Sequence, residues 1–237
     1  MFTKEEIDKL RLEYIKYTSF IIPEIDDVVY ENTDRFYGEI NHNEISFGKY
    51  IIHLSNSLNS CPIEFQNAVV YHEFTHIYDY ITNASLSKNQ IDGFMHTYSE
   101  AHAEAIKLRH LLKLDMKRKI NQGIRYLESN NGKSDIGTVT STYLNQSLTS
   151  YTLFTQEKLP KHFYNFLHSY CHFCGYMTIR IQKEATIIID GILEKFPPQY
   201  RGDLKELYYS IEKKNFQKCC EIHDKLQLDA FKITIEK

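Results

Sequence analysis

The sequence lacks three features that would define whole classes of protein: a long hydrophobic run, an excess of basic charge, and a Gly/Ser-rich linker or internal repeat. No apolar stretch approaches the roughly 18 residues of a membrane-spanning helix, which excludes a transmembrane segment. The 28 basic and 31 acidic residues give a net charge of −3, so dedicated nucleic-acid binding is not expected. The 42% of hydrophobic and 25% of charged residues are ordinary for a globular chain, which excludes wholesale disorder.

The cysteines and the first residues bear on the compartment. Five cysteines are an odd number, and Cys219 and Cys220 are adjacent, which favours free thiols over a disulfide framework. The N-terminus carries Glu5 and Glu6 where a signal peptide would carry basic residues and then an apolar stretch. We therefore expect a cytoplasmic protein, with export by a route that needs no signal peptide as the alternative.

The first half of the chain mixes helical and strand patterns. Residues 3–18 have apolar positions at helical spacing behind a capping threonine, and residues 60–82 form a second helical pattern. Between them, β-branched and aromatic segments predict a small antiparallel sheet of three or four strands at residues 28–30, 36–40, 44–47 and 50–54. Residues 83–93 read as a loop, after which Thr97 and Glu100 resemble the capping box of a helix running to about residue 114.

Beyond residue 118 the pattern is helical, with polar turns and no clear strand before a short tail at residues 233–235. The expected fold is therefore α+β, with the small sheet and the helices of residues 1–117 followed by an all-α lobe over residues 118–237.

The helix predicted at residues 60–82 contains His72-Glu-Phe-Thr-His76, the pattern H-E-x-x-H. Side chains at positions i and i+4 project from one face of a helix, so both imidazoles can bind a single metal ion. Glu73 lies about 100° around the helix, where it can act as a general base toward a metal-activated water. The alternative is a pair of hydrogen-bonded core histidines, since apolar residues share their face.

A catalytic zinc site needs a third protein ligand and one open position. Glu100, which follows His76 by 24 residues, is the first choice, and Glu104 lies one turn further along the same face. Glu104 suits a role behind the ligands, accepting the second ring N–H of a ligating histidine. Asp79, one turn after His76, suits a similar supporting role. The remaining candidates for the third ligand are Glu104 itself, Asp79, His96 and His102.

These residues resemble the zincin metallopeptidases, and within them the gluzincin branch, in which H-E-x-x-H is followed by a helix with a glutamate ligand. The minigluzincins, the ImmA/IrrE-type peptidases and the compact peptidases with HExxHxxD…SExxA are similar; the corresponding residues here are 72–79 and 99–103. The resemblance covers residues 35–115 and implies a zincin-like lobe that binds Zn²⁺ through His72, His76 and Glu100. The glycine and third histidine of the metzincins are missing, no helix-turn-helix is evident, and residues 120–237 resemble no family.

The resemblance implies a zinc metalloendopeptidase with Glu73 as the catalytic base and a protein or peptide as its substrate. It also implies an edge strand, expected at residues 50–54, to which an extended substrate adds. A noncatalytic interaction module in which zinc only fastens the two lobes is the rival interpretation. A toxin, effector or mobile-element protein that cuts one specific host protein is a third.

The second half of the chain contributes weaker candidates. A cluster of soft ligands at residues 168–174 could form a second metal site, although one helix cannot direct all of its histidines and cysteines inward. A histidine or tyrosine of this half could instead stabilise the oxyanion of a tetrahedral intermediate. The residues considered for this role are His162, Tyr164, His168, Tyr170 and His172.

Overall fold

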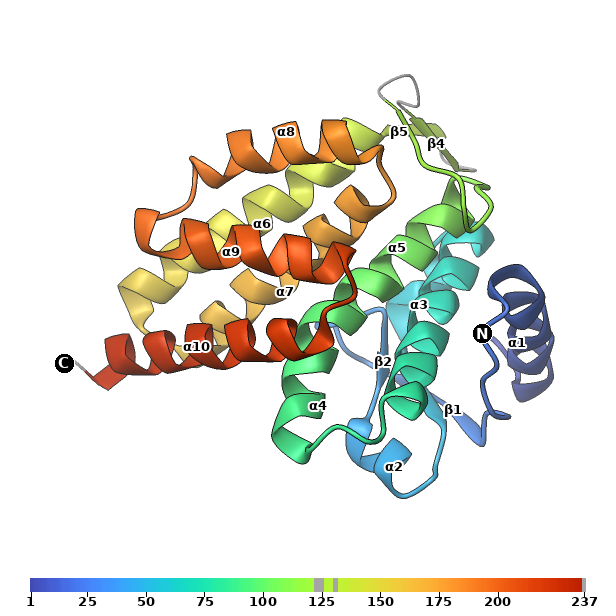
Figure 1. Ribbon diagram of the computed structural model, residues 1–237. Coiled ribbons are helices and arrows are strands. Elements are labelled where there is room, and N and C mark those ends of the chain that lie inside the picture. The colour runs from blue at the N-terminus through green and yellow to red at the C-terminus, as the bar shows by residue number, and fades with distance from the viewer. Residues whose placement is uncertain (122–125, 130–131, 236–237) are drawn as a thin grey trace. The chain divides into compact units, whose positions relative to one another are not determined.

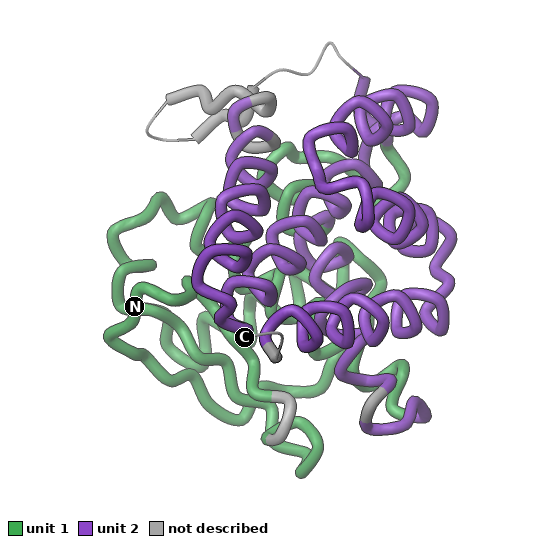
Figure 2. The backbone as a smooth tube through the Cα atoms, turned by 90° about the vertical axis from the view of Figure 1, so that its left-hand side faces the viewer, with its two compact units in different colours: residues 1–84, 106–118, 126–134 green, residues 85–105, 119–125, 135–237 purple. Residues whose placement is uncertain are grey.

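The computed structural model describes residues 1–121, 126–129 and 132–235, and its backbone divides into two compact units (Figure 2). The first unit comprises residues 1–84, 106–118 and 126–134, and the second comprises residues 85–105, 119–125 and 135–237. The sequence predicts that residues 85–105 belong to the N-terminal lobe, whereas they group with the C-terminal helices in the second unit. Within the described ranges, no helix has both the length and the hydrophobicity to cross a membrane.

The first helix of the first unit, α1 (Lys4–Thr18), begins with the predicted cap. The Thr3 side chain accepts a hydrogen bond from the Glu6 N–H, and the Glu6 side chain accepts one from the Thr3 N–H, which forms a complete capping box. The helix buries Ile7, Leu10 and Tyr14. The prediction of a helix over residues 3–18 is therefore confirmed.

The sheet of the first unit has three strands in the order β1 (Asp27–Glu31), β3 (Ile51–Ser55) and β2 (Gly38–Ile40). The prediction of an antiparallel sheet is wrong in part, because β1 pairs with β3 in parallel while β2 pairs with β3 antiparallel. A parallel pair is possible because the connection between β1 and β3 is long enough to carry a crossover.

Two strand predictions change accordingly. The segment expected as an edge strand at residues 50–54 is the central strand β3, paired on both sides and with Ile52 and Leu54 fully buried. The strand expected at residues 44–47 is instead the end of a short helix, α2 (His42–Ser46), closed by a hydrogen bond from the Ile45 N–H to the Asn41 carbonyl. Local hydrogen bonding after Asn41 competes with strand pairing there. The edges of the sheet are therefore β1 and β2.

The longest helix of the first unit, α3 (Ile63–Thr82), follows a 3₁₀ turn, η1 (Asn56–Ser60), and carries the H-E-x-x-H motif. It packs against α1, where the Tyr14 ring makes edge contacts with Tyr71 at 5.2 Å and Phe74 at 5.4 Å. The hydroxyl groups of Tyr14 and Thr75 are 3.0 Å apart in a buried hydrogen bond. The helix predicted at residues 60–82 is confirmed, and α1 fixes the face opposite the histidines.

The second unit opens with a continuous helical segment: α4 (Lys88–Phe94), a π-helical turn η2 (Met95–Ser99), and α5 (Glu100–Leu111), whose last residues belong to the first unit (Figure 1). The predicted loop at residues 83–93 is therefore half helical. The capping box predicted at Thr97 is wrong, because Thr97 is buried inside the helix and its hydroxyl donates to the Gly93 carbonyl.

Within the described residues, the rest of the second unit is built from five helices around an aromatic core. In chain order they are α6 (Ile136–Glu157), α7 (Pro160–Thr178), α8 (Gln182–Leu193), α9 (Pro198–Glu212) and α10 (Phe216–Ile235). Proline stands in the first turn of α7 and α9, where its missing N–H is tolerated. Residues 118–237 are not all helical as predicted, since β4 (Tyr126–Ser129) and β5 (Gly132–Asp135) pair as a two-stranded sheet, of which residues 126–134 belong to the first unit. The tail at residues 233–235 is the last turn of α10 and forms no strand.

Candidate metal centre

The two histidines of the motif lie side by side on α3 in the first unit. Their Nε2 atoms are 3.0 Å apart and their ring centroids 4.7 Å apart, as expected for positions i and i+4. His72 is 9% exposed and His76 is 6% exposed. The pair therefore presents two convergent nitrogen atoms from a buried, rigid helix, in a geometry that also allows one ring to donate a hydrogen bond to the other.

Glu73 is 3% exposed and faces the backbone of an edge strand. A Cβ atom built on Gly38, the first residue of β2, would lie 2.8 Å from Glu73 Oε1 and 2.9 Å from Val69 Cγ1. Glycine is therefore required for β2 to approach the helix this closely. The carboxylate of Glu73 therefore lies against the face of β2 at Gly38, within the first unit.

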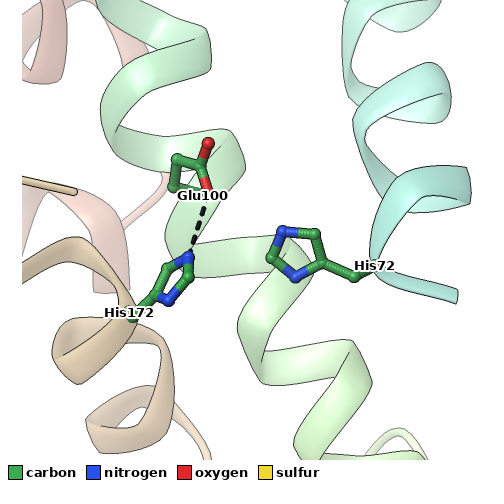
Figure 3. A group of neighbouring side chains, drawn as sticks. All are labelled: His72, Glu100 and His172. Atoms are coloured by element: carbon green, nitrogen blue, oxygen red, sulfur yellow. Dashed lines mark hydrogen bonds and ion pairs between the residues drawn. The ribbon is translucent and has the colours of Figure 1, made fainter. Parts of the chain in front are cut away.

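Glu100 begins α5 directly after the π-helical turn, which shifts the phase of the helix at this point. Its side chain is 13% exposed, and its Oε2 lies 3.1 Å from His172 Nε2. The His168 Nδ1 atom is 3.5 Å from the other carboxylate oxygen of Glu100. Figure 3 draws Glu100 and His172, joined by this hydrogen bond, together with His72 of α3.

Glu104 is fully buried one turn after Glu100. It accepts a hydrogen bond from the Tyr143 hydroxyl of α6, and its Oε2 is 3.9 Å from His172 Nδ1. His172 thus has a carboxylate at each ring nitrogen. Burial lowers its pKa to about 4, with the neighbouring His168 acting in the same direction and the carboxylates opposing it. The imidazole of His172 is therefore neutral near pH 7.

A close helix crossing positions this network within the second unit. A Cβ atom built on Gly175 of α7 would lie 2.3 Å from the Ala101 carbonyl oxygen and 3.1 Å from Glu104 Cβ. The absence of a side chain lets α7 touch the backbone of α5, one turn from His172. Gly175 is thus the residue that brings the histidines of α7 to the carboxylates of α5.

The other candidates from the sequence lie in varied surroundings. Asp79 is 2% exposed, near the end of α3, and its charge adds to the burial that raises the pKa of Tyr14. His96 stacks on His223 at 5.6 Å, and His102 packs against Tyr98 at 5.4 Å. Asp79 thus lies toward α1, while His96 and His102 belong to aromatic contacts of the second unit.

The soft-ligand cluster at residues 168–174 separates into two faces of α7. His168 and His172 face Glu100, whereas Cys171 and Cys174 are fully buried, and burial raises the pKa of both thiols. Protonated buried thiols behave as small apolar side chains. All five cysteines are free, as predicted, and the geometry gives no support to a second metal site in this cluster.

The histidines and tyrosines considered for oxyanion stabilisation differ in the groups that they contact. Tyr170 donates to the Leu204 carbonyl at 2.8 Å, and His162 is 2.8 Å from Glu157. Tyr164 stacks on His168 at 5.8 Å. His168 and His172 both contact Glu100.

Sequence reasoning missed Gly38, Tyr143 and Gly175. The spacing of His168 and His172 at i and i+4 on a helix is a signal that the sequence does carry, as it does for the motif histidines. Tyr143 and the two glycines carry no comparable signal, because their roles depend on which elements become neighbours.

A scan against protein-family models, a search of curated proteins and a search of solved structures each found no match.

Proposed function

We propose that the protein is a zinc-dependent metallopeptidase with a zincin-like N-terminal lobe. The observation that carries the proposal is the pair of buried imidazoles on α3, whose Nε2 atoms converge to 3.0 Å beside the buried carboxylate of Glu73. In this proposal His72 and His76 bind Zn²⁺ together with Glu100. Glu104 and His172 hold the Glu100 side of the site.

The donor set fits zinc. Two nitrogen ligands at about 2.0–2.1 Å from a tetrahedral zinc lie about 3.3 Å apart, close to the separation of the two Nε2 atoms. Two imidazoles and one carboxylate are the ligands of the gluzincin type, and they leave the fourth position open. A bound Zn²⁺ would supply Lewis-acid activation of both a water molecule and the scissile carbonyl group.

Glu73 takes the proton of the attacking water and later delivers it to the leaving amine. Its burial on a rigid helix fixes the carboxylate, and its contact with β2 places it beside an edge strand. An extended peptide that adds to the outer edge of β2 would bring its backbone close to this carboxylate. The strand proposed for substrate binding is therefore β2, in place of residues 50–54.

His168 and His172 are proposed to stabilise the oxyanion, since both contact Glu100 and His172 is neutral. In this proposal a ring N–H that points at Glu100 in the resting site turns to the developing negative charge in the transition state, which lowers the barrier. Glu104 and Tyr143 orient His172 from behind.

The direct test measures zinc per chain and peptide hydrolysis for the wild type, His76→Ala and Glu73→Gln. We expect about one zinc in the wild type and in Glu73→Gln and markedly less in His76→Ala, with hydrolysis lost in both variants. Hydrolysis that survives in Glu73→Gln would refute the role of Glu73 as the base.

The rival function is a noncatalytic interaction module in which zinc has a structural role. It requires a fourth protein ligand, and His172 is the candidate for that ligand. Its Nε2, 3.1 Å from Glu100 Oε2, could occupy the fourth position and close the site. X-ray absorption spectra of the zinc protein distinguish the two. A wild-type spectrum with three protein ligands, unchanged in His172→Ala, supports the peptidase, whereas the loss of one nitrogen ligand in His172→Ala supports the module.

A further inference from the structure

A cavity lies wholly within the second unit. It is a groove of about 690 Å³ between α7 and α10, closed at one side by Phe154 of α6. Its floor is apolar, since Phe154, Phe163 and Leu167 are almost completely buried. Its rim carries Leu228 and Phe231, which are 55% and 61% exposed. The volume is in the range of sites that enclose an organic ligand of substantial size.

One end of the groove is polar. His96, His168 and His223 line this end, and His96 stacks on His223. Burial lowers the pKa of both His96 and His223, so these two imidazoles are neutral near pH 7. Gln227 also lines this end, and its Nε2 lies 3.1 Å from His223 Nε2, so its Oε1 can accept a hydrogen bond from the N–H of an amide.

The charges at the rim also select against an ion. Lys161 and Asp224 both line the groove, so one positive and one negative side chain balance each other. A ligand with a strong net charge gains nothing from this arrangement. The groove therefore favours an uncharged ligand with apolar side groups and some amide character.

The length of the groove suits a short stretch of extended chain. The lining residues of α7 run from Pro160 to His168, which spans about 12 Å at the rise of an α-helix. Four residues of extended peptide cover about 13 Å. A single small metabolite would leave much of this length unfilled.

The polar end of the groove meets the candidate metal centre through a single side chain. His168 lines the groove and its Nδ1 lies 3.5 Å from Glu100 Oε1. A peptide in the groove would thus point one end toward the carboxylate proposed as the third zinc ligand. This connection lies entirely within the second unit.

We propose that the groove between α7 and α10 binds an apolar segment of about four residues in the substrate polypeptide and so sets the specificity of the enzyme. The proposal rests on the proposed peptidase function for its biological meaning. The binding itself needs neither zinc nor catalysis, which allows the two to be tested apart.

The test uses the full chain with Glu73→Gln, so that no probe is cleaved. The probe is a blocked tetrapeptide of alternating leucine and phenylalanine on a soluble dye-labelled tail, and its binding is measured by fluorescence anisotropy with zinc and with EDTA. The test variant adds Leu228→Glu and Phe231→Glu, two exposed positions at which a change is compatible with folding. The matched control adds Ile187→Glu, an equally exposed isoleucine of α8 outside the groove.

We expect the double variant to bind the probe at least about tenfold more weakly, because a charge replaces apolar contact, while the control matches the parent. A probe of glycine and serine on the same tail should not bind. Equal affinity in the double variant and the control would overturn the proposal. Tight binding of dodecanoate without binding of the tetrapeptide would also overturn it, in favour of a lipid site.

The two proposals fail in different ways. If the wild type neither binds zinc nor hydrolyses peptides but the apolar probe still binds in the groove, the peptidase function fails and the groove is retained as a peptide site. If the wild type hydrolyses apolar peptides and Leu228→Glu with Phe231→Glu leaves the cleavage preference unchanged, the specificity role of the groove is wrong and the peptidase function is retained.

Discussion

At the scale of single residues, the surroundings of Glu73 combine burial with a backbone contact. A carboxylate that is 3% exposed and pressed against an edge strand has few rotamers available, so its position is fixed before any substrate arrives. This arrangement requires a glycine at position 38, where the strand and the helix are in contact. The close contact with β2 therefore supports the proposed role of Glu73 as a base with a fixed position.

Gly38→Ala is expected to lower both stability and activity. The added methyl group would meet Glu73 Oε1 at 2.8 Å and Val69 Cγ1 at 2.9 Å, so β2 or the Glu73 side chain has to shift, at a cost of about 1–3 kcal/mol. Urea unfolding measures the first effect and peptide hydrolysis the second. Gly202→Ala is the control: nothing lies within 4 Å of its added Cβ in α9, and alanine favours the helix, so its stability should not fall. Wild-type behaviour of Gly38→Ala would show that β2 lies farther from Glu73.

At the scale of elements, the contact between α5 and α7 fixes the positions of Glu100 and Glu104, as the contact between β2 and α3 fixes that of Glu73. Gly175→Ala would place a methyl group 2.3 Å from the Ala101 carbonyl oxygen, a backbone atom that cannot rotate away. We expect a loss of at least about 2 kcal/mol in the free energy of unfolding, together with weaker zinc binding because α7 carries His172. Gly191→Ala of α8, whose Cβ meets nothing, should match or exceed wild-type stability. Unchanged stability in Gly175→Ala would contradict the close crossing.

The helix α2 is tied to the sheet by His53, which gives the first unit a dependence on pH. His53 Nδ1 is 2.7 Å from Glu31 Oε1, and its Nε2 is 3.2 Å from Glu44 Oε2. Glu39 of β2 is the residue that pairs with His53 in the sheet. Burial lowers the His53 pKa, but the hydrogen bonds to Glu44 and Glu31 outweigh this and raise it above its usual value. The stabilisation is therefore complete below about pH 6.5 and is lost as the pH rises through the raised pKa.

The measurement compares urea unfolding of the wild type and His53→Gln at pH 6 and at pH 8.5. We expect the destabilisation by His53→Gln to be larger at pH 6, where the wild-type imidazole is charged between its carboxylates. Glu44→Gln should reduce the difference between the two pH values, since it removes one of the two partners. An equal effect at both pH values would show that the charge of His53 contributes nothing.

The elements that the sequence predicts well are those whose signals are local. The capping box at Thr3 and the helical periodicity of residues 60–82 are contained in the segments themselves, and both helices are confirmed. The partner of a strand is not local: β3 has the β-branched character of any strand, and its central place depends on the parallel pairing with β1. The π-helical turn before Glu100 likewise depends on packing. The residues around Thr97 match a capping box, which wrongly predicts the start of a helix there.

At the scale of the whole molecule, the candidate site illustrates the same limit. The proposed ligand pair and the proposed base come from one helical motif, so the sequence alone suggests His72, Glu73 and His76. The network around Glu100 and Glu104 joins three segments distant in the chain, because α5 carries both carboxylates, α6 supplies Tyr143 and α7 supplies His172. No spacing rule relates such segments, because their proximity is created by packing between helices.

Zinc binding should couple the two units, because the proposed ligands come from both: His72 and His76 from the first and Glu100 from the second. A ligand at 100 times its dissociation constant adds about 2.7 kcal/mol to the free energy of unfolding, which for a chain of this length raises Tm by about 5–10 °C. Scanning calorimetry with zinc and with EDTA measures the shift. We expect the full shift in Glu73→Gln, which keeps the ligands, and a much smaller one in Glu100→Gln and His76→Ala. Hydrogen exchange adds the spatial test: zinc should increase amide protection in both α3 and the first turns of α5, whereas protection confined to α3 would mean that Glu100 is not a ligand.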